Sequence, residues 1–150
     1  LAGAAVALLT RSSEKQAIGK SCGASFCAGD AKSVLEHWPD GADLVVECAG
    51  VPETVSMAPG LTRSGGRIVI LGVLPNGQKV PIEPFDLLFR EINLKFAFLN
   101  PFTQARATEM IGSGLINLTP LVSREINHDE VAGVIENAPL RGDIRAILRF

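Results

Sequence analysis

Short, continuous apolar runs alternate along this chain with stretches in which apolar residues recur every third or fourth position. The runs lie at residues 5–9 (AVALL), 43–48 (DLVVEC) and 67–73 (RIVILGV). An uninterrupted apolar run is typical of a strand that is covered on both faces of its sheet. We therefore expect buried strands at 5–9 and 43–48, and the run at 67–73 is the strongest indication of a strand in the chain.

The intervening stretches carry the start signals of helices. Ser13 and Gln16 have the spacing of a capping box, and Asp30 can cap a second helix. Pro52 suits the first turn of a third helix, in which Pro59 predicts a kink or an early end. Three further helices are expected, over 85–90, after Thr103, and from Val131 to a stop at Pro139.

A period of two appears later in the chain. Over 92–98, apolar Ile92, Leu94, Phe96 and Phe98 alternate with Asn93, Lys95 and Ala97. This predicts a strand near the sheet edge with one buried face. Residues 121–126 and 144–150 are also expected to be extended.

Strands that alternate with helices predict a doubly wound α/β fold with a parallel sheet. Right-handed crossovers bring the carboxyl ends of such strands to one edge, where ligands bind. The strand ends in question are Thr10-Arg11, Cys48-Ala49-Gly50, Gly72-Val73 and Leu99-Asn100.

Composition narrows the class of protein. The chain has 150 residues, of which 47% are hydrophobic and 20% charged, and its net charge of −2 argues against a nucleic-acid surface. No apolar stretch approaches the roughly 20 residues that span a bilayer. The three cysteines do not suggest a disulfide framework, so we expect reduced thiols and a cytoplasmic protein. Cys22 and Cys27 lack zinc-ligand spacing, and His37 and His128 have no partner ligand nearby, so we expect no metal site.

Three segments carry a resemblance to a known family: "ECAGVPETV", "GGRIVILG" and "NPFTQARATEMIGSGLI". Together with the order of the elements, they resemble the C-terminal, nucleotide-binding half of medium-chain zinc-type alcohol dehydrogenases. Within that family the chain is most similar to the polyol and threonine dehydrogenase branch. The resemblance implies a Rossmann-like fold and an oxidoreductase that transfers hydride between a secondary alcohol and a nicotinamide cofactor.

Two parts of the family pattern are missing. No glycine-rich turn follows a first strand; Gly112-Ser113-Gly114 ends a helix instead. The catalytic N-terminal domain, with its zinc ligands, is also absent. We therefore expect residues 1–150 to be a partial NAD(P)-binding domain with no catalytic residue, inactive alone, with zinc only in the missing domain. The strands at 5–9 and 43–48 would flank the gap, and we expect them to pair or to be bridged by another segment or chain.

The resemblance places the adenosine ribose beside Thr10, where the family often has an acid. A hydroxyl next to Arg11 would instead accept the 2′-phosphate of NADP, and Ser12 and Lys15 could add contacts. The alternative is that Arg11 is a solvated charge and the serines only cap a helix, in which case NAD is not disfavoured.

The other positions matched to the family's cofactor site are Cys48, Ala49, Gly50, Leu71, Gly72, Val73, Phe98, Leu99 and Arg145. Arg145 would reach the pyrophosphate, and an exposed strand charge is the equal alternative. Glu47, beside them, is expected to make a structural hydrogen bond at a strand end rather than to act as an acid.

Two other functions stay open. One is a non-catalytic nucleotide-binding or structural interaction module; the other is a zinc-free quinone or enoyl reductase of the same superfamily. We also expect a homo-oligomer that forms through the 92–98 edge.

Overall fold

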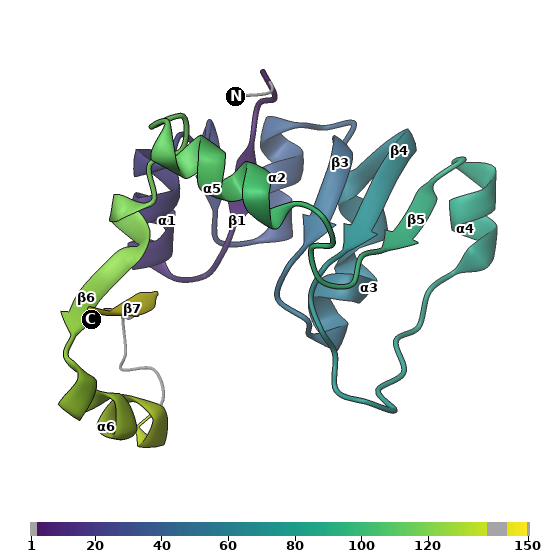
Figure 1. The fold of residues 1–150 in the computed structure, drawn as a ribbon. Helices are drawn as coiled ribbons and strands as arrows, with labels where there is room; N and C mark the ends of the chain where they lie inside the picture. The colour runs from purple at the N-terminus through teal and green to yellow at the C-terminus, as the bar shows by residue number, and fades with distance from the viewer. Residues whose placement is uncertain (1–2, 138–143, 150) are drawn as a thin grey trace. The chain divides into compact units, whose positions relative to one another are not determined.

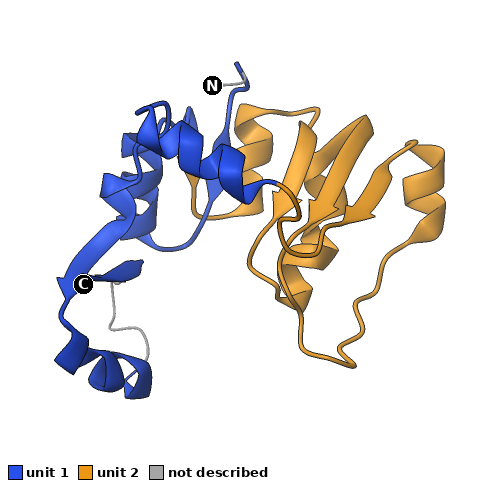
Figure 2. Ribbon diagram, in the orientation of Figure 1, with its two compact units in different colours: residues 1–27, 103–150 blue, residues 28–102 orange. Residues whose placement is uncertain are grey.

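A computed structural model describes residues 3–137 and 144–149 of the chain. These residues divide into two compact units, shown in different colours in Figure 2. Unit 2 is one continuous stretch, residues 28–102, whereas unit 1 combines residues 1–27 with residues 103–150. The expected stop of the last helix at Pro139 lies outside the described residues.

Unit 2 is built on a parallel three-stranded sheet with the order β3-β4-β5 (Figure 1). Its strands are β3 (Ala42–Glu47), β4 (Thr62–Ile70) and β5 (Asn93–Phe96). Helix α3 (Pro52–Leu61) connects the first two and α4 (Pro84–Phe89) the last two, while α2 (Ala31–His37) precedes β3. β3 and β4 are thus each followed by a helix and a parallel neighbour, and β5 lies at an edge as expected.

The core of unit 2 lies between α3 and the sheet. Val55 and Ala58 of α3 pack with Ile68 and Ile70 of β4 and with Ile92 just before β5. Ile68 is 0% exposed. This apolar contact is what holds α3 against one face of the sheet.

Among its described residues, unit 1 has two smaller sheets and three α-helices. Strand β1 (Ala7–Leu9) pairs with β2 (Phe26–Ala28), which ends one residue past the unit boundary, and α1 (Ser13–Ser21) connects them. Strands β6 (Val122–Ile126) and β7 (Arg145–Leu148) pair in parallel. The remaining elements are α5 (Gln104–Gly112), α6 (Val131–Glu136) and the 3₁₀ turns η1 (Thr119–Leu121) and η2 (His128–Glu130).

The α/β class with parallel strands is therefore confirmed, and so is the Asp30 cap. Asp30 Oδ1 accepts a hydrogen bond from the Ser33 amide at 2.7 Å. The cap of α1, however, is Ser12 and not Ser13: Ser12 Oγ accepts from the Lys15 amide at 3.2 Å. The expected capping box does not form, because the Gln16 side chain donates to the Thr10 carbonyl at 2.8 Å.

The strand expected at 67–73 corresponds to β4, which begins earlier, at Thr62, and ends earlier, at Ile70. Residues 64–66 do not form a separate turn; they lie inside β4, with Gly65 at φ +72°. The register between β3 and β4 shifts between Ala42 and Leu44, which is the mark of a bulge. Helix α3 also does not end at Pro59 but continues to Leu61.

The expectation that β3 is fully buried is wrong, and β1 is only partly buried. Leu44 is 47% exposed and Val46 46%, while Val45 between them packs on the core. Phe96 and Phe98 are likewise exposed, although Ile92 is buried. The physical reason is that, within unit 2, α3 covers only one face of the sheet.

The strands expected to flank the gap do not pair with each other. β1 and β3 belong to separate sheets. The remaining part of that expectation, that another segment or chain bridges them, stays a prediction.

Candidate functional site

Hydrogen bonds to Glu47 connect the carboxyl ends of β3 and β4. The Glu47 carbonyl accepts hydrogen bonds from the amides of Leu71 at 2.8 Å and Gly72 at 3.0 Å. Parallel pairing of β3 with β4 thereby extends past Ile70 into the turn that follows it. The two turns that carry predicted cofactor residues thus leave the sheet side by side.

The Glu47 carboxylate holds the turn that follows its own strand. Its Oε1 accepts from the amides of Ala49 at 2.7 Å and Gly50 at 2.9 Å, and from the Thr54 hydroxyl at 2.7 Å. Glu47 is 5% exposed. This is the structural hydrogen bonding at a strand end that the sequence led us to expect.

Two glycines allow these turns to approach closely. Gly50 has φ +67°, and a Cβ there would lie 2.7 Å from the Val73 carbonyl oxygen. A Cβ on Gly72 would overlap the Gly50 backbone and the Glu47 carboxylate. Both positions therefore require glycine.

A cavity of about 300 Å³ opens at the ends of β4 and β5. It is lined by Ile70, Leu71, Gly72, Val73, Leu74, Phe96, Ala97 and Phe98. Four of the predicted cofactor residues, Leu71, Gly72, Val73 and Phe98, thus share one largely apolar cavity. Leu99 does not line it, and its backbone has φ +56°.

Cys48 lies at the end of β3 in the same unit. Burial raises the pKa of its thiol, and the neighbouring Glu47 carboxylate raises it further. The side chain is therefore held as a neutral thiol rather than a thiolate, which does not suit a nucleophile or a metal ligand.

The predicted phosphate-binding residues gather in unit 1, where β1 passes into α1. Thr10 is partly buried, and its Oγ1 accepts from the Ser12 amide at 3.4 Å. Arg11 and Lys15 are exposed. In the described part of the chain the Arg11 guanidinium forms no ion pair, so its donors face solvent.

Arg145 also lies in unit 1, but on β7, which pairs with β6, whereas Thr10 follows β1, which pairs with β2. The predicted residues therefore form one group at the start of α1 and a second at the strand ends of unit 2, while Arg145 lies on β7 of unit 1. The structure brings together the members of each group.

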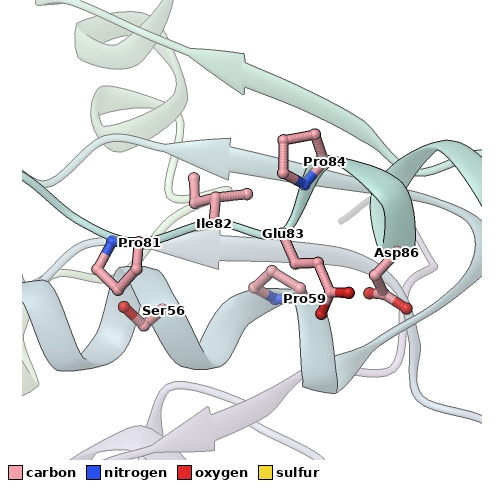
Figure 3. A pocket seen from close by; sticks show the side chains of 7 residues that line it. All are labelled: Ser56, Pro59, Pro81, Ile82, Glu83, Pro84 and Asp86. Carbon is pink, nitrogen blue, oxygen red and sulfur yellow. The ribbon is translucent and has the colours of Figure 1, made fainter.

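A larger cavity, of about 570 Å³, lies elsewhere in unit 2 and is shown in Figure 3. Its lining residues are Ser56, Pro59, Pro81, Ile82, Glu83, Pro84 and Asp86. Asp86 is paired with Arg90 at 3.0 Å. The Glu83 and Asp86 carboxylates lie next to each other on one side of Pro59 (Figure 3), where they would repel an anion. No predicted site residue lines it.

Within residues 3–137 and 144–149, no group of three or more His, Cys, Asp or Glu side chains is arranged to hold a metal ion. Over the same residues, no helix is both long enough and apolar enough to cross a membrane.

Comparison with known proteins assigns the family. Residues 1–112 match the zinc-binding dehydrogenase family. L-arabinitol 4-dehydrogenase of Penicillium rubens is 30% identical over 139 residues, which is 87% of this chain and 35% of that protein. Sorbitol dehydrogenase of Gallus gallus is 26% identical over 97% of this chain and 43% of that protein.

A solved structure is similar over nearly the whole chain. It is a protein of Sinorhizobium meliloti 1021 assigned as a zinc-binding dehydrogenase and solved bound to NADP. It is 39% identical, with a TM-score of 0.89 over 96% of this chain and 44% of that one. The chain thus spans less than half the length of these proteins, and it belongs to the zinc-binding dehydrogenase family, with the Rossmann-like α/β fold of its nucleotide-binding part.

Proposed function

We propose that this chain is the cofactor-binding portion of an NAD(P)-dependent zinc-type alcohol or polyol dehydrogenase, and that NADP is its preferred cofactor. The observation that carries the proposal is the 39% identity, over 96% of the chain, to a protein solved with NADP. The relatives named as arabinitol and sorbitol dehydrogenases support a polyol as the substrate class.

The catalytic zinc of such an enzyme does not fit the residues described here, because they contain no suitable ligand cluster. We therefore propose that residues 1–150 are part of a nucleotide-binding domain and that zinc and substrate are bound by the remainder of a longer protein. The chain alone is then inactive, and no catalytic step is assigned to its own side chains.

The 2′-phosphate of NADP would bind where β1 meets α1. The exposed Arg11 guanidinium offers a planar set of donors that matches a phosphate. Ser12 Oγ already accepts the Lys15 amide, so its hydroxyl hydrogen stays available for a phosphate oxygen. The Lys15 side chain and the helix N-terminus add positive potential.

The nicotinamide would lie at the strand ends of unit 2. Leu71, Gly72, Val73 and Phe98 would supply an apolar wall that excludes water. Cys48, Ala49 and Gly50 would face the adjoining ribose. Leu99 would close this end, and Arg145 would reach the pyrophosphate. The cofactor supplies the hydride acceptor, and these residues hold and orient it.

The test compares cofactors in the complete gene product. The ratio of kcat/KM for NADP to that for NAD is measured for the unaltered protein and for the double variant Thr10→Asp, Arg11→Ala. A charge-assisted hydrogen bond contributes about 1.5–3 kcal/mol, so the unaltered protein should prefer NADP by about ten- to hundredfold. The variant should lose this preference, chiefly through weaker use of NADP.

The matched control is Lys20→Ala, which removes an exposed charge from the other end of α1 and should leave the ratio unchanged. An unaltered protein that prefers NAD would contradict the phosphate site at Thr10 and Arg11. A protein that oxidises no alcohol or polyol with either cofactor would contradict the proposed function, in favour of the non-catalytic module.

A further inference from the structure

Glu47 forms hydrogen bonds with several separate parts of the predicted cofactor site. Its carbonyl holds Leu71 and Gly72, and its carboxylate oxygen Oε1 holds Ala49, Gly50 and Thr54. A single residue thereby joins the turn after β3, the turn after β4 and the first turn of α3.

The second carboxylate oxygen of Glu47, Oε2, is buried and accepts no hydrogen bond from the residues that the structure describes. It lies against Gly72, where a Cβ would overlap it. A buried carboxylate oxygen without a donor is unfavourable for stability. The glutamate is therefore not explained by stability alone, and its placement points to the geometry of the two turns.

We propose that Glu47 is the positioning residue of the cofactor site. Its side chain holds Ala49 and Gly50 in the turn after β3, beside Leu71 and Gly72, which its backbone carbonyl binds. Glu47 does not itself touch the cofactor, because it is 5% exposed. This inference rests on the proposed function, since those turns are the ones assigned to the cofactor. A rigid, preformed site binds more tightly because less chain has to be ordered on binding.

The chemistry of the side chain sets the expected order of variants. Glutamine keeps the reach and an acceptor oxygen for Ala49, Gly50 and Thr54, and loses no bond at Oε2. Aspartate keeps the charge but is shorter by one methylene, and alanine keeps neither reach nor acceptor. Cofactor affinity should therefore fall in the order Glu, Gln, then Asp and Ala together.

The experiment uses the complete gene product and measures the Kd for NADP by calorimetry together with kcat at saturating cofactor. Glu47→Ala and Glu47→Asp should each raise the Kd by about tenfold or more, and Glu47→Gln by no more than about threefold. The kcat at saturation should change little in all three, because the cofactor is held correctly once bound. The control is Glu53→Gln, an exposed acid in the first turn of α3, which should match the unaltered protein.

A second measurement needs no cofactor. Amide exchange followed by NMR should show faster exchange at Ala49 and Gly50 in Glu47→Ala, with the amides of β4 unchanged. If Glu47→Ala does not fold, Thr54→Val tests the proposal instead. Valine removes the hydroxyl that donates to Glu47 Oε1 and keeps the shape of the threonine side chain. That variant should raise the Kd by about two- to threefold.

The outcomes separate the two proposals. If Glu47→Asp or Thr54→Val binds NADP as tightly as the unaltered protein, Glu47 is not a positioning residue, even though the protein binds its cofactor. If the unaltered protein binds neither NADP nor NAD, the proposed function itself is wrong, and this role for Glu47 falls with it.

Discussion

The pKa of the Cys48 thiol is set by the surroundings of this side chain at the site. Partial burial disfavours the thiolate, and the carboxylate of Glu47 adds like-charge repulsion, so the pKa of the thiol is raised above its ordinary value of 9.0. The folded protein thus holds the Cys48 proton to a higher pH than an unfolded chain does.

We predict that Cys48 is alkylated by iodoacetamide more slowly than a cysteine in an unstructured peptide at pH 8. The difference should shrink as the pH rises through the raised pKa, because only the thiolate reacts. Site-resolved mass spectrometry of the labelled chain gives the rate, and the same chain unfolded in urea is the control. Faster labelling of the folded form at pH 8 would contradict the assignment.

Some residue positions could be predicted from the sequence, and others could not. Asp30 caps α2 as expected, because a cap depends only on neighbours a few residues away. The role of Glu47 could be expected in part, since an acid two residues before the small residues Ala49 and Gly50 suits a strand-end turn. Its contacts to Leu71 and Gly72 depend on the register between β3 and β4, which no local pattern contains.

At the scale of elements, Arg90 connects three segments of unit 2. Its guanidinium donates to the Pro59 carbonyl at 3.2 Å near the end of α3 and to the Thr62 carbonyl at the start of β4, and it pairs with Asp86 of α4 at 3.0 Å. The backbone carbonyl of Arg90 also accepts from Gly65 at 2.8 Å, within the bulge. The Thr62 carbonyl, at the C-cap of α3, obtains a donor in this way, while the Pro59 carbonyl also accepts from the Thr62 amide.

We predict that Arg90→Ala lowers the free energy of unfolding by about 2–3 kcal/mol, because a buried carbonyl at Thr62 loses its donor. Urea denaturation followed by circular dichroism measures the change. Arg63→Ala is the control: Arg63 pairs with Asp43 at the surface and should give a much smaller change. Equal effects of the two substitutions would contradict this role for Arg90.

The bulge and the exposed sheet face show why element boundaries are harder to predict than the elements themselves. Ser64-Gly65-Gly66 has the composition of a turn, and only pairing with β3 keeps it inside a strand. Leu44 and Val46 have the composition of a buried strand, and only the layer above them decides whether they are buried. Within unit 2 that layer is missing on their side.

At the scale of the molecule, unit 2 exposes several large apolar side chains on α4 and β5. Phe85 is 68% exposed, Leu88 77%, Phe89 79% and Phe96 74%. Phe85 and Phe89 stack with ring centroids 5.8 Å apart, so they present one aromatic surface. Exposed apolar surface of this kind, beside an edge strand, favours association with another chain.

We predict that the chain associates with itself through this surface. Sedimentation velocity should show a larger species that grows with concentration, and Ala97→Asp should shift it towards monomer, because Ala97 follows directly on β5. Ala105→Asp, at an exposed position in α5 of unit 1, is the control and should change nothing. A strict monomer at high concentration, or a Ala97→Asp variant that still associates, would contradict the prediction.

The division of the chain into one continuous and one discontinuous unit sets an order of events during synthesis. Unit 2 is complete once Phe102 has left the ribosome, and domains fold as units while the chain is still being made. Unit 1 must wait until the residues from Thr103 onward have also emerged. Thr10, Arg11 and Lys15 are therefore translated before unit 2 but reach their final surroundings after it.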